Sequence, residues 1–272
     1  MTESGKLVSM SSRMKSQAQA PAVSTRREAA RKLTADLAAA AGTPSSAEAV
    51  KRAMDAFLPE EDDGDPRARK RRRILEAGTA LLVRQGYRKT SMDEVARDAH
   101  VAKGTLYLYF PTKAELLAAA MAEEKARFAP RMAGMLDPAL SPRERVRFLV
   151  KAVFAGLPEM PLMMRMLAGD AEVHHALNEL GRHLEKPVLS IQVDYVRGLV
   201  AAAAPGLPEE RTTTVAQVVL ALIYAAPTLL DARLRGAVPV EAFADALADL
   251  VVDGLGNAAT TGAGTPPRRG RR

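Results

Sequence analysis

Apolar residues recur three and four positions apart through most of residues 66–255, with charged and small polar residues between them. This spacing gathers apolar side chains on one face of a helix, whereas a half-buried strand alternates at every second residue. The hydrophobic fraction is 47% but only 4% of the residues are aromatic, which also favours packed helices over sheets. We therefore predict an all-α fold with helices over 66–85, 91–98, 102–110, 112–131, 141–157, 160–168, 171–204, 208–235 and 239–255.

Composition divides the chain into four segments. Residues 1–65 form an extension that begins with small polar residues, contains two weak helical patterns and ends in an acidic linker, so we expect it to be partly disordered. Residues 66–117 and residues 118–256 carry the strong helical patterns and are predicted to be a small and a larger helical domain. Residues 257–272 are rich in Gly, Thr and Pro and end in RRGRR, which predicts a disordered basic tail.

The small domain contains two short helices joined by a tight turn. Ser91, with Glu94 three residues later, forms a capping box that starts the first of them, and residues 98–100 lead into the turn. The second helix, 102–110, is short and slim enough to enter a DNA major groove about 12 Å wide. This layout is typical of a helix-turn-helix DNA reader; the alternative is an ordinary helix pair whose tyrosines are half-buried.

Amino and hydroxyl groups crowd the second of these helices and its surroundings. Lys103 suits a guanine edge or a phosphate, and Thr105 can bond a base or touch a thymine methyl group. Lys113 begins the next helix, where free N–H groups favour a phosphate. The predicted DNA-binding residues are Arg69, Arg72, Ser91, Lys103, Gly104, Thr105, Tyr107, Tyr109 and Lys113.

Positive charge is concentrated in the same part of the chain. Residues 66–115 carry 12 basic and 5 acidic side chains, whereas residues 116–255 carry 14 and 17. The run RARKRRR at 67–73 stands at the start of a helix, where cations oppose the helix dipole unless phosphate compensates for them. A basic excess confined to one segment is typical of phosphate binding, and the alternative for the run is a solvated helix start.

The small domain resembles the N-terminal DNA-binding domain of the TetR family of bacterial repressors. That family has a Lys-Gly-Thr-Leu-Tyr-x-Tyr-Phe-x-x-Lys pattern, and this chain reads KGTLYLYFPTK at 103–113. The chain departs from the family at His100, where Gly is usual in the turn, although His tolerates a left-handed backbone better than most residues. The resemblance implies that Lys103, Gly104 and Thr105 contact bases or the DNA backbone. It also implies that Tyr107, Tyr109 and Lys113 contact phosphates.

The larger domain carries two apolar stripes, in 208–235 and 239–255, that are too long for one partner each. Paired with their symmetry mates they would form a four-helix dimer interface, which is also how TetR-like regulators associate; the alternative is packing within one chain. The predicted interface residues are Val215, Val219, Leu222, Ile223, Leu229, Phe243, Leu247 and Leu250.

A methionine-rich segment between two prolines suits either ordinary core packing or the wall of a pocket for a hydrophobic effector, because Met adapts to varied apolar shapes. The predicted pocket residues are Met160, Met163, Met164, Met166, Leu177 and Tyr195.

Several classes of chemistry are excluded or disfavoured. The chain has no Cys, so disulfides, thiolate zinc sites and cysteine nucleophiles are excluded. The histidines lack carboxylates at ligand spacing, so we predict no metal site, and no cofactor. The longest apolar stretch, 214–230, contains Gln217 and Pro227 and is too short to span a membrane. We therefore expect a cytoplasmic, nucleoid-associated protein.

Together these features predict a homodimeric transcriptional regulator and not an enzyme. The expected protein is a repressor that a small hydrophobic effector releases from a palindromic DNA operator. Two rivals remain: a helical carrier or enzyme that uses its apolar interior for lipid or acyl groups, and an architectural DNA-binding protein. No nucleophile, base and acid stand at recognisable spacing, which argues against the enzyme.

Overall fold

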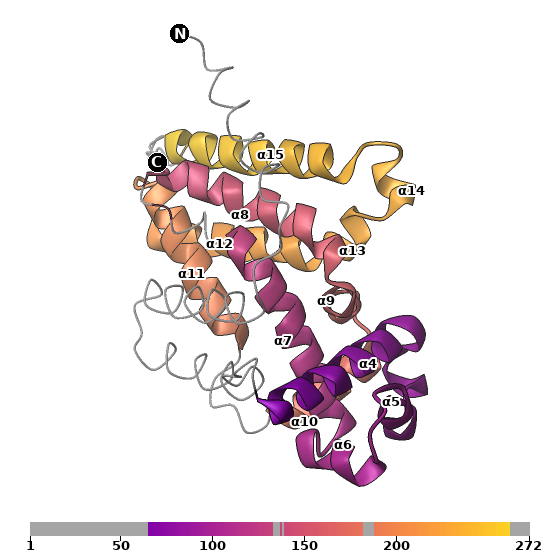
Figure 1. Cartoon of the computed structure of the whole chain (residues 1–272). Helices are drawn as coiled ribbons and strands as arrows, with labels where there is room; N and C mark the ends of the chain where they lie inside the picture. Colours follow the sequence, from indigo (N-terminus) through magenta and orange to yellow (C-terminus); the bar gives the residue numbers. More distant parts are fainter. Residues whose placement is uncertain (1–64, 133–136, 138, 182–187, 262–272) are drawn as a thin grey trace, which may run out of the picture.

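The computed structural model describes residues 65–132, 137, 139–181 and 188–261, and within this part every regular element is a helix. Figure 1 shows a three-helix unit, α4 to α6, at one end of the molecule and a bundle that includes α8, α11, α12 and α15 at the other. The all-α fold is therefore confirmed for the described residues, and the weak helical patterns of the extension lie outside them.

The three-helix unit begins with α4 (Pro66–Lys89). The Asp65 carboxylate caps this helix by accepting a bond of 2.9 Å from the N–H of Arg67. Gly86 interrupts α4 with a φ of 84°, a conformation that glycine adopts without strain. The helix was expected to end near this residue, but it bends there and continues to Lys89. Helices α5 (Met92–Asp98) and α6 (Lys103–Tyr109) pack against α4 around a small apolar core.

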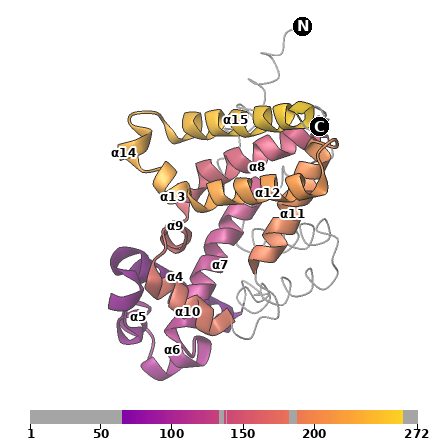
Figure 2. The same cartoon turned by 180° about the vertical axis from the view of Figure 1, so that it is seen from behind.

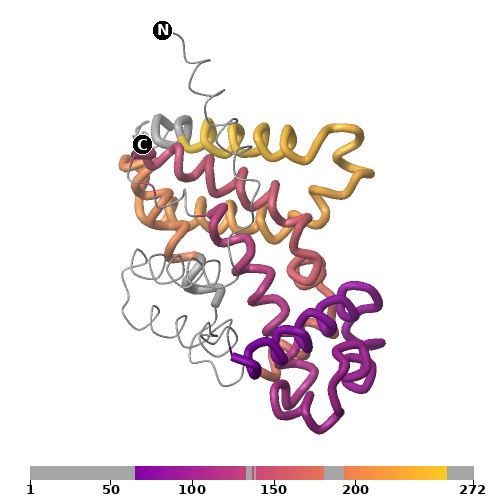
Figure 3. The backbone as a smooth tube through the Cα atoms, in the orientation of Figure 1, coloured from indigo at the N-terminus to yellow at the C-terminus, as the bar shows by residue number. Residues whose placement is uncertain are grey.

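Helix α7 (Lys113–Met132) joins this unit to the rest of the molecule, as Figure 3 shows in the path of the backbone. A Cβ atom on Gly78 of α4 would stand 2.7 Å from Leu116 of α7, so this glycine lets the two helices approach closely. The buried apolar residues form one continuous cluster from Ile74 to Leu255. Helix α7 thus runs across the boundary expected at residues 117 and 118, and both regions share one core.

In the bundle, α8 (Pro142–Gly156) lies between α15 (Val240–Thr261) and α12 (Glu209–Tyr224), an order that Figures 1 and 2 show from opposite sides. Helix α11 (Val188–Ala203) packs against both α8 and α12. Arg147 and Lys151 of α8 form ion pairs with Asp245 of α15, the second at 2.6 Å. Helix α15 continues to Thr261, so residues 257–261 are helical. The disordered tail expected from residue 257 is therefore wrong for these five residues.

The single helix expected over 208–235 is wrong: the structure has α12, α13 (Ala226–Leu229) and α14 (Ala232–Arg235) in its place. Pro227 has no N–H to donate to the preceding turn, so α12 ends before it and a new helix begins. Asp231 then caps α14 by accepting a bond of 2.8 Å from the N–H of Arg233. Within 171–204, where one helix was expected, the structure gives α10 (Ala171–Gly181) and α11, and residues 182–187 between them lie outside the described residues.

Two short elements, η2 (Leu157–Glu159) and α9 (Pro161–Leu167), lie between the bundle and the three-helix unit (Figure 1). The buried carboxylate of Glu124, on α7, accepts bonds of 3.1 Å from the N–H groups of Leu162 and Met163 at the start of α9. Arg165 of α9 donates to the carbonyl of Val83 in α4 at 3.0 Å. Helix α9 is thus hydrogen-bonded to α4, which is part of the three-helix unit, and to α7, which joins that unit to the bundle.

Candidate nucleic-acid interface

The turn between α5 and α6 has the geometry that its sequence predicts. Ser91 and Glu94 form the expected capping box, with the Glu94 N–H donating to the Ser91 hydroxyl at 3.2 Å and the Ser91 N–H donating to the Glu94 carboxylate at 3.1 Å. His100 has a φ of 54°, so it occupies the left-handed conformation expected of a residue that replaces glycine. The capping box thus starts α5, and the turn at His100 leads from the end of α5 into α6.

Helix α6 presents one face to the core and the opposite face to solvent. Leu106 and Phe110 are buried, whereas Gly104, Tyr107 and Leu108 are exposed. The residues that we expected on DNA are divided between these positions, because Thr105 and Tyr109 are half-buried. Leu108 was missed by the sequence reasoning, although its position midway between two apolar core residues could have indicated it.

Lys103 at the start of α6 already has an acidic partner. Its ammonium group lies 2.8 Å from the Asp93 carboxylate, at the N-terminal end of α5, and both side chains are largely exposed. The hydrogen bond to Asp93 raises the pKa of Lys103 above its ordinary value. The lysine therefore lies at the edge of the solvent-facing surface of α6 and is positively charged. A phosphate that binds Lys103 would have to displace the Asp93 carboxylate.

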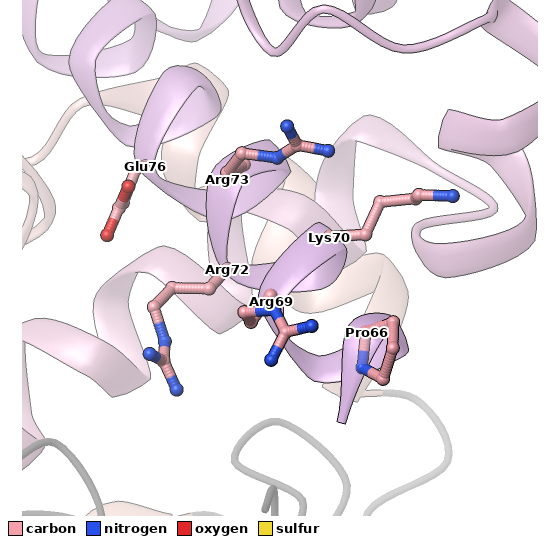
Figure 4. A pocket seen from close by; sticks show the side chains of 6 residues that line it. All are labelled: Pro66, Arg69, Lys70, Arg72, Arg73 and Glu76. Carbon is pink, nitrogen blue, oxygen red and sulfur yellow. The ribbon is translucent and has the colours of Figure 1, made fainter. Parts of the chain in front are cut away.

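The first three turns of α4 line a basic hollow of about 480 Å³, with Pro66, Arg69, Lys70, Arg72, Arg73 and Glu76 around it. Figure 4 shows Lys70 and Arg73 extending to one side of the helix and Arg72 to the other, with Glu76 one turn further along. The guanidinium group of Arg71 lies 5.0 Å from the centre of the Phe110 ring, which follows α6 directly. This contact ties the basic turn of α4 to the C-terminal end of α6.

Lys113 requires a correction, because its ammonium group does not face solvent in the way a phosphate ligand would. It donates to the carbonyl groups of Tyr87 at 2.8 Å and Thr90 at 3.0 Å, and it lies 4.3 Å from the centre of the Tyr87 ring. Burial lowers the pKa of Lys113. The lysine thus satisfies the last carbonyl groups of α4 and joins α4 to α7, so we assign it a structural role.

Ser91 likewise has a local function, since its hydroxyl both accepts from the Glu94 N–H and donates to the Glu94 carboxylate. The backbone and side-chain bonds from Ser91 lower the pKa of Glu94, so the cap is charge-assisted.

The two arginines of α4 that were expected on DNA both lie in the basic hollow. Arg69 is exposed and Arg72 is half-buried.

The residues expected to form an effector pocket lie in or near the interior. Met160 and Met163 are buried around α9, while Met164, Met166 and Leu177 are half-buried. Tyr195 of α11 is 8% exposed, and its hydroxyl group has no hydrogen-bond partner among the described residues. Burial raises the pKa of Tyr195 to about 12, while nearby Arg145 opposes that shift.

The residues expected at a dimer interface differ in exposure. Val219 is 3% exposed and packs in the core of its own chain, so including it was wrong, and the neighbouring Val218, at 54%, is the exposed residue. Leu250 is 71% exposed. The other expected residues are half-buried, namely Val215, Leu222, Ile223, Leu229, Phe243 and Leu247.

Two further features bear on the expectations for metals and membranes. His174 donates from Nε2 to the Met166 carbonyl at 2.9 Å, and the Nε2 atom of His175 lies 3.7 Å from the Glu179 carboxylate, while His183 lies outside the described residues. In the described part of the chain, no three His, Cys, Asp or Glu side chains gather as metal ligands would. Within the same part, no helix has the length and apolar character needed to cross a membrane.

Comparison with known proteins identifies relatives of this arrangement. The model of the bacterial regulatory proteins of the tetR family matches residues 74–120. The HTH-type transcriptional repressor KstR of Rhodococcus jostii is 34% identical over 133 residues, which are 46% of this chain and 62% of that repressor. The KstR repressor of Mycolicibacterium smegmatis is 31% identical over 136 residues, 48% of this chain and 67% of that protein. The chain thus spans less than two thirds of the first of these relatives.

A solved structure extends the likeness beyond the aligned sequences. The crystal structure of a TetR-like transcriptional regulator from Rhodococcus sp. RHA1 superimposes with a TM-score of 0.51 and 28% sequence identity. The superposition covers 71% of this chain and 98% of that protein. The likeness therefore includes the helical bundle as well as the three-helix unit.

Proposed function

The chain belongs to the TetR family of bacterial regulatory proteins, and on that premise we propose that it is a transcriptional repressor that binds duplex DNA through α6. One observation carries the proposal: α6 is a short helix whose solvent face presents Gly104, Tyr107 and Leu108, with the exposed ammonium group of Lys103 at its start. Bases are read in the major groove by a short helix, while phosphates beside the groove attract arginine and lysine.

The roles of individual residues follow from their exposure. Gly104 allows the α6 backbone to approach base edges, and Thr105 is positioned beside it for a hydrogen bond to a base. Tyr107 and Lys103 flank this face and contact phosphates, as do Arg69 and Arg72 of the basic hollow. Tyr109, which is half-buried, contributes its hydroxyl group at the edge.

The repressor acts as a homodimer held through α12 and α15. Each helix exposes one large apolar side chain, Val218 on α12 and Leu250 on α15, which a dimer interface would remove from water. A two-fold axis would place two copies of α6 on the same side of the duplex, about 34–36 Å apart, or one helical turn. The operator is accordingly a palindrome with half-sites at that spacing.

A small apolar effector regulates DNA binding from the interior of the larger domain, beside Tyr195 of α11. The buried Tyr195 hydroxyl without a partner supports a ligand that carries a hydrogen-bond acceptor, since an unpaired buried donor costs about 1–3 kcal/mol. Helix α11 packs against α8, which contacts α7, and α7 runs to the three-helix unit. The effector must bind the DNA-free conformation more tightly than the DNA-bound one, because equal affinity would shift no equilibrium.

Selection of duplexes from a random library by the full chain tests the function. Fluorescence anisotropy then compares the selected duplex with a scrambled duplex of the same composition at several salt concentrations. We expect the selected duplex to bind about 10³-fold or more tightly at physiological salt. Equal affinity for both duplexes would favour an architectural DNA-binding protein, and no salt-dependent binding to either would favour the carrier of lipid or acyl groups.

A further inference from the structure

Leu108 is the most exposed of the large apolar residues in the described part of the chain, at 84%. It lies in the middle of α6, two residues after fully buried Leu106 and two before buried Phe110. Successive residues of a helix turn by about 100°, so Leu108 points away from the core by about 200° from Leu106. The side chain therefore stands at the centre of the surface that α6 presents to solvent.

The position one turn before Leu108, on the same face of α6, carries no side chain. Gly104 lies one turn earlier on the same face, and a Cβ atom built on it would meet no atom within 4 Å. Helix α6 thus offers bare backbone at its start and one projecting isobutyl group further along. When such a helix enters a groove about 12 Å wide, the projecting group is the one that reaches furthest toward the base edges.

We propose that Leu108 contacts the C5-methyl group of a thymine and so specifies a thymine at one position of each half-site. This inference rests on the proposed DNA-binding function and adds the chemistry of one of its contacts. Thymine alone places a methyl group in the major groove, whereas the other bases present donors and acceptors there. Those polar groups would lose water beside Leu108 without gaining a hydrogen bond, so they are disfavoured.

Helix geometry predicts where this thymine lies relative to the base that Thr105 reads. Leu108 is three residues beyond Thr105, which corresponds to about 4.5 Å along the helix axis. Bases of one strand are about 3.4 Å apart along the duplex. The thymine should therefore lie within about two base pairs of the position whose preference changes in a Thr105→Ala variant.

The test uses the duplex that wild-type protein selects from a random library, with each thymine replaced in turn by deoxyuridine, which lacks only the methyl group. At one thymine of each half-site, loss of the methyl group should weaken wild-type binding about fourfold, as expected for about 0.8 kcal/mol from one buried carbon. The Leu108→Ala variant should bind thymine and deoxyuridine duplexes equally well at that position. The matched control is Leu234→Ala, which shortens another exposed leucine, on α14 and outside the DNA surface, and should retain the methyl effect.

The outcomes separate this inference from the function on which it rests. A selected sequence whose deoxyuridine effects are unchanged in Leu108→Ala would overturn the thymine contact and leave sequence-specific DNA binding intact. Failure of wild-type protein to select any sequence would overturn both. Because Leu108 contacts solvent over most of its surface, Leu108→Ala should fold normally, and circular dichroism of the variant checks this.

Discussion

Asp93 and Lys103 hold each other at the edge of the surface that we assign to DNA, so one acidic residue lies where phosphates are expected. The pair is exposed, and water and salt screen it. In the proposed complex, Lys103 would exchange this carboxylate for a phosphate, while Asp93 would repel the backbone of the duplex. Asp93 would thus weaken attraction to DNA of any sequence, which would increase the share of binding that depends on base contacts.

Replacing Asp93 with Asn should strengthen binding to a scrambled duplex and make the log K versus log salt slope steeper by up to about one unit, because Lys103 is freed for phosphate. Anisotropy titrations between low and moderate salt measure both quantities. The control is Glu241→Gln, which makes the same change in net charge on the distant helix α15. If both variants gave the same slope, the Asp93 effect would be one of net charge alone.

Lys113 supports a different prediction, since its ammonium group is bonded to carbonyl groups of the chain. Lys113→Ala should lower the free energy of unfolding by about 1–2 kcal/mol, because half-buried carbonyl groups lose a charged donor. The salt slope of DNA binding should stay unchanged. Denaturant unfolding and salt titrations test this, with exposed Lys89→Ala as the control for loss of one charge. Normal stability with a slope reduced by one unit would restore the phosphate contact.

The position of the reading helix could be predicted from the sequence, but the bonds of its neighbours could not. Spacing alone located α6, and the Ser91–Glu94 box and the conformation of His100 are local features that a sequence records. The partners of Lys113 lie 23 to 26 residues earlier in the chain, and no local pattern indicates that distance. Similarly, Val218 and Val219 are both apolar, and only packing shows which of them is buried.

Among the elements, apolar periodicity was a reliable guide to helices and a poor guide to where they end. Residues of 208–235 keep their spacing of three and four across the break before Pro227, because α13 continues to bury Ala226 and Leu230. The proline was the only local sign of that break. Helix α4 shows the opposite case, in which Gly86 bends the chain but the following residues return to helix.

Glu124 connects α7 to the first turn of α9, and its carboxylate is buried. Burial raises the pKa of Glu124, and the two backbone bonds only partly offset this. A carboxyl group whose pKa is raised by folding stabilises the protein fully below its unfolded pKa of about 4.3, and this contribution is lost as pH rises through the folded pKa. The stability that Glu124 contributes therefore falls as pH rises above its unfolded pKa.

Glu124→Gln removes the titrating group while keeping one oxygen acceptor. We expect the variant to match wild type at low pH, where the protonated carboxyl group of Glu124 also offers one carbonyl oxygen, and to become the more stable of the two as pH rises, because the amide has no charge to bury. The stability difference between wild type and variant should therefore grow as pH rises above about 4.3. Chemical denaturation at several pH values measures that difference, and a difference independent of pH would contradict the assignment.

For the whole molecule, one apolar core extends from α4 to α15, so the DNA-reading unit is not a separate module on a linker. Helices α7, α9 and α10 each contact α4, and Arg88 of α4 lies 3.5 Å from Glu172 of α10. A change around α9 therefore has direct contacts with α4, and a change around α11 can reach α7 through α8. This continuity supports control by an effector that binds in the larger domain.

Dimerisation is the property of the whole molecule on which the proposed operator binding would depend. Val218→Asp combined with Leu250→Asp would bury unpaired charges at the proposed interface, and we expect monomers in sedimentation at concentrations where wild type is dimeric. The monomers should stay folded, since both side chains are exposed in one chain. As a control, Leu234→Asp adds a charge at another exposed leucine and should leave the dimer intact. A dimer that survives the double substitution would place the interface elsewhere.

The most direct test of the account is a hydroxyl-radical footprint of the full chain on the duplex that it selects. The account predicts two protected stretches on the same side of the duplex, centred about one helical turn apart, or 10–10.5 base pairs, with related sequences in opposite orientation. Thr105→Ala should shift sequence preference in both stretches, since each copy of α6 reads one half-site. A single protected stretch, or protection that does not depend on sequence, would contradict the claim that two symmetry-related α6 helices read this DNA.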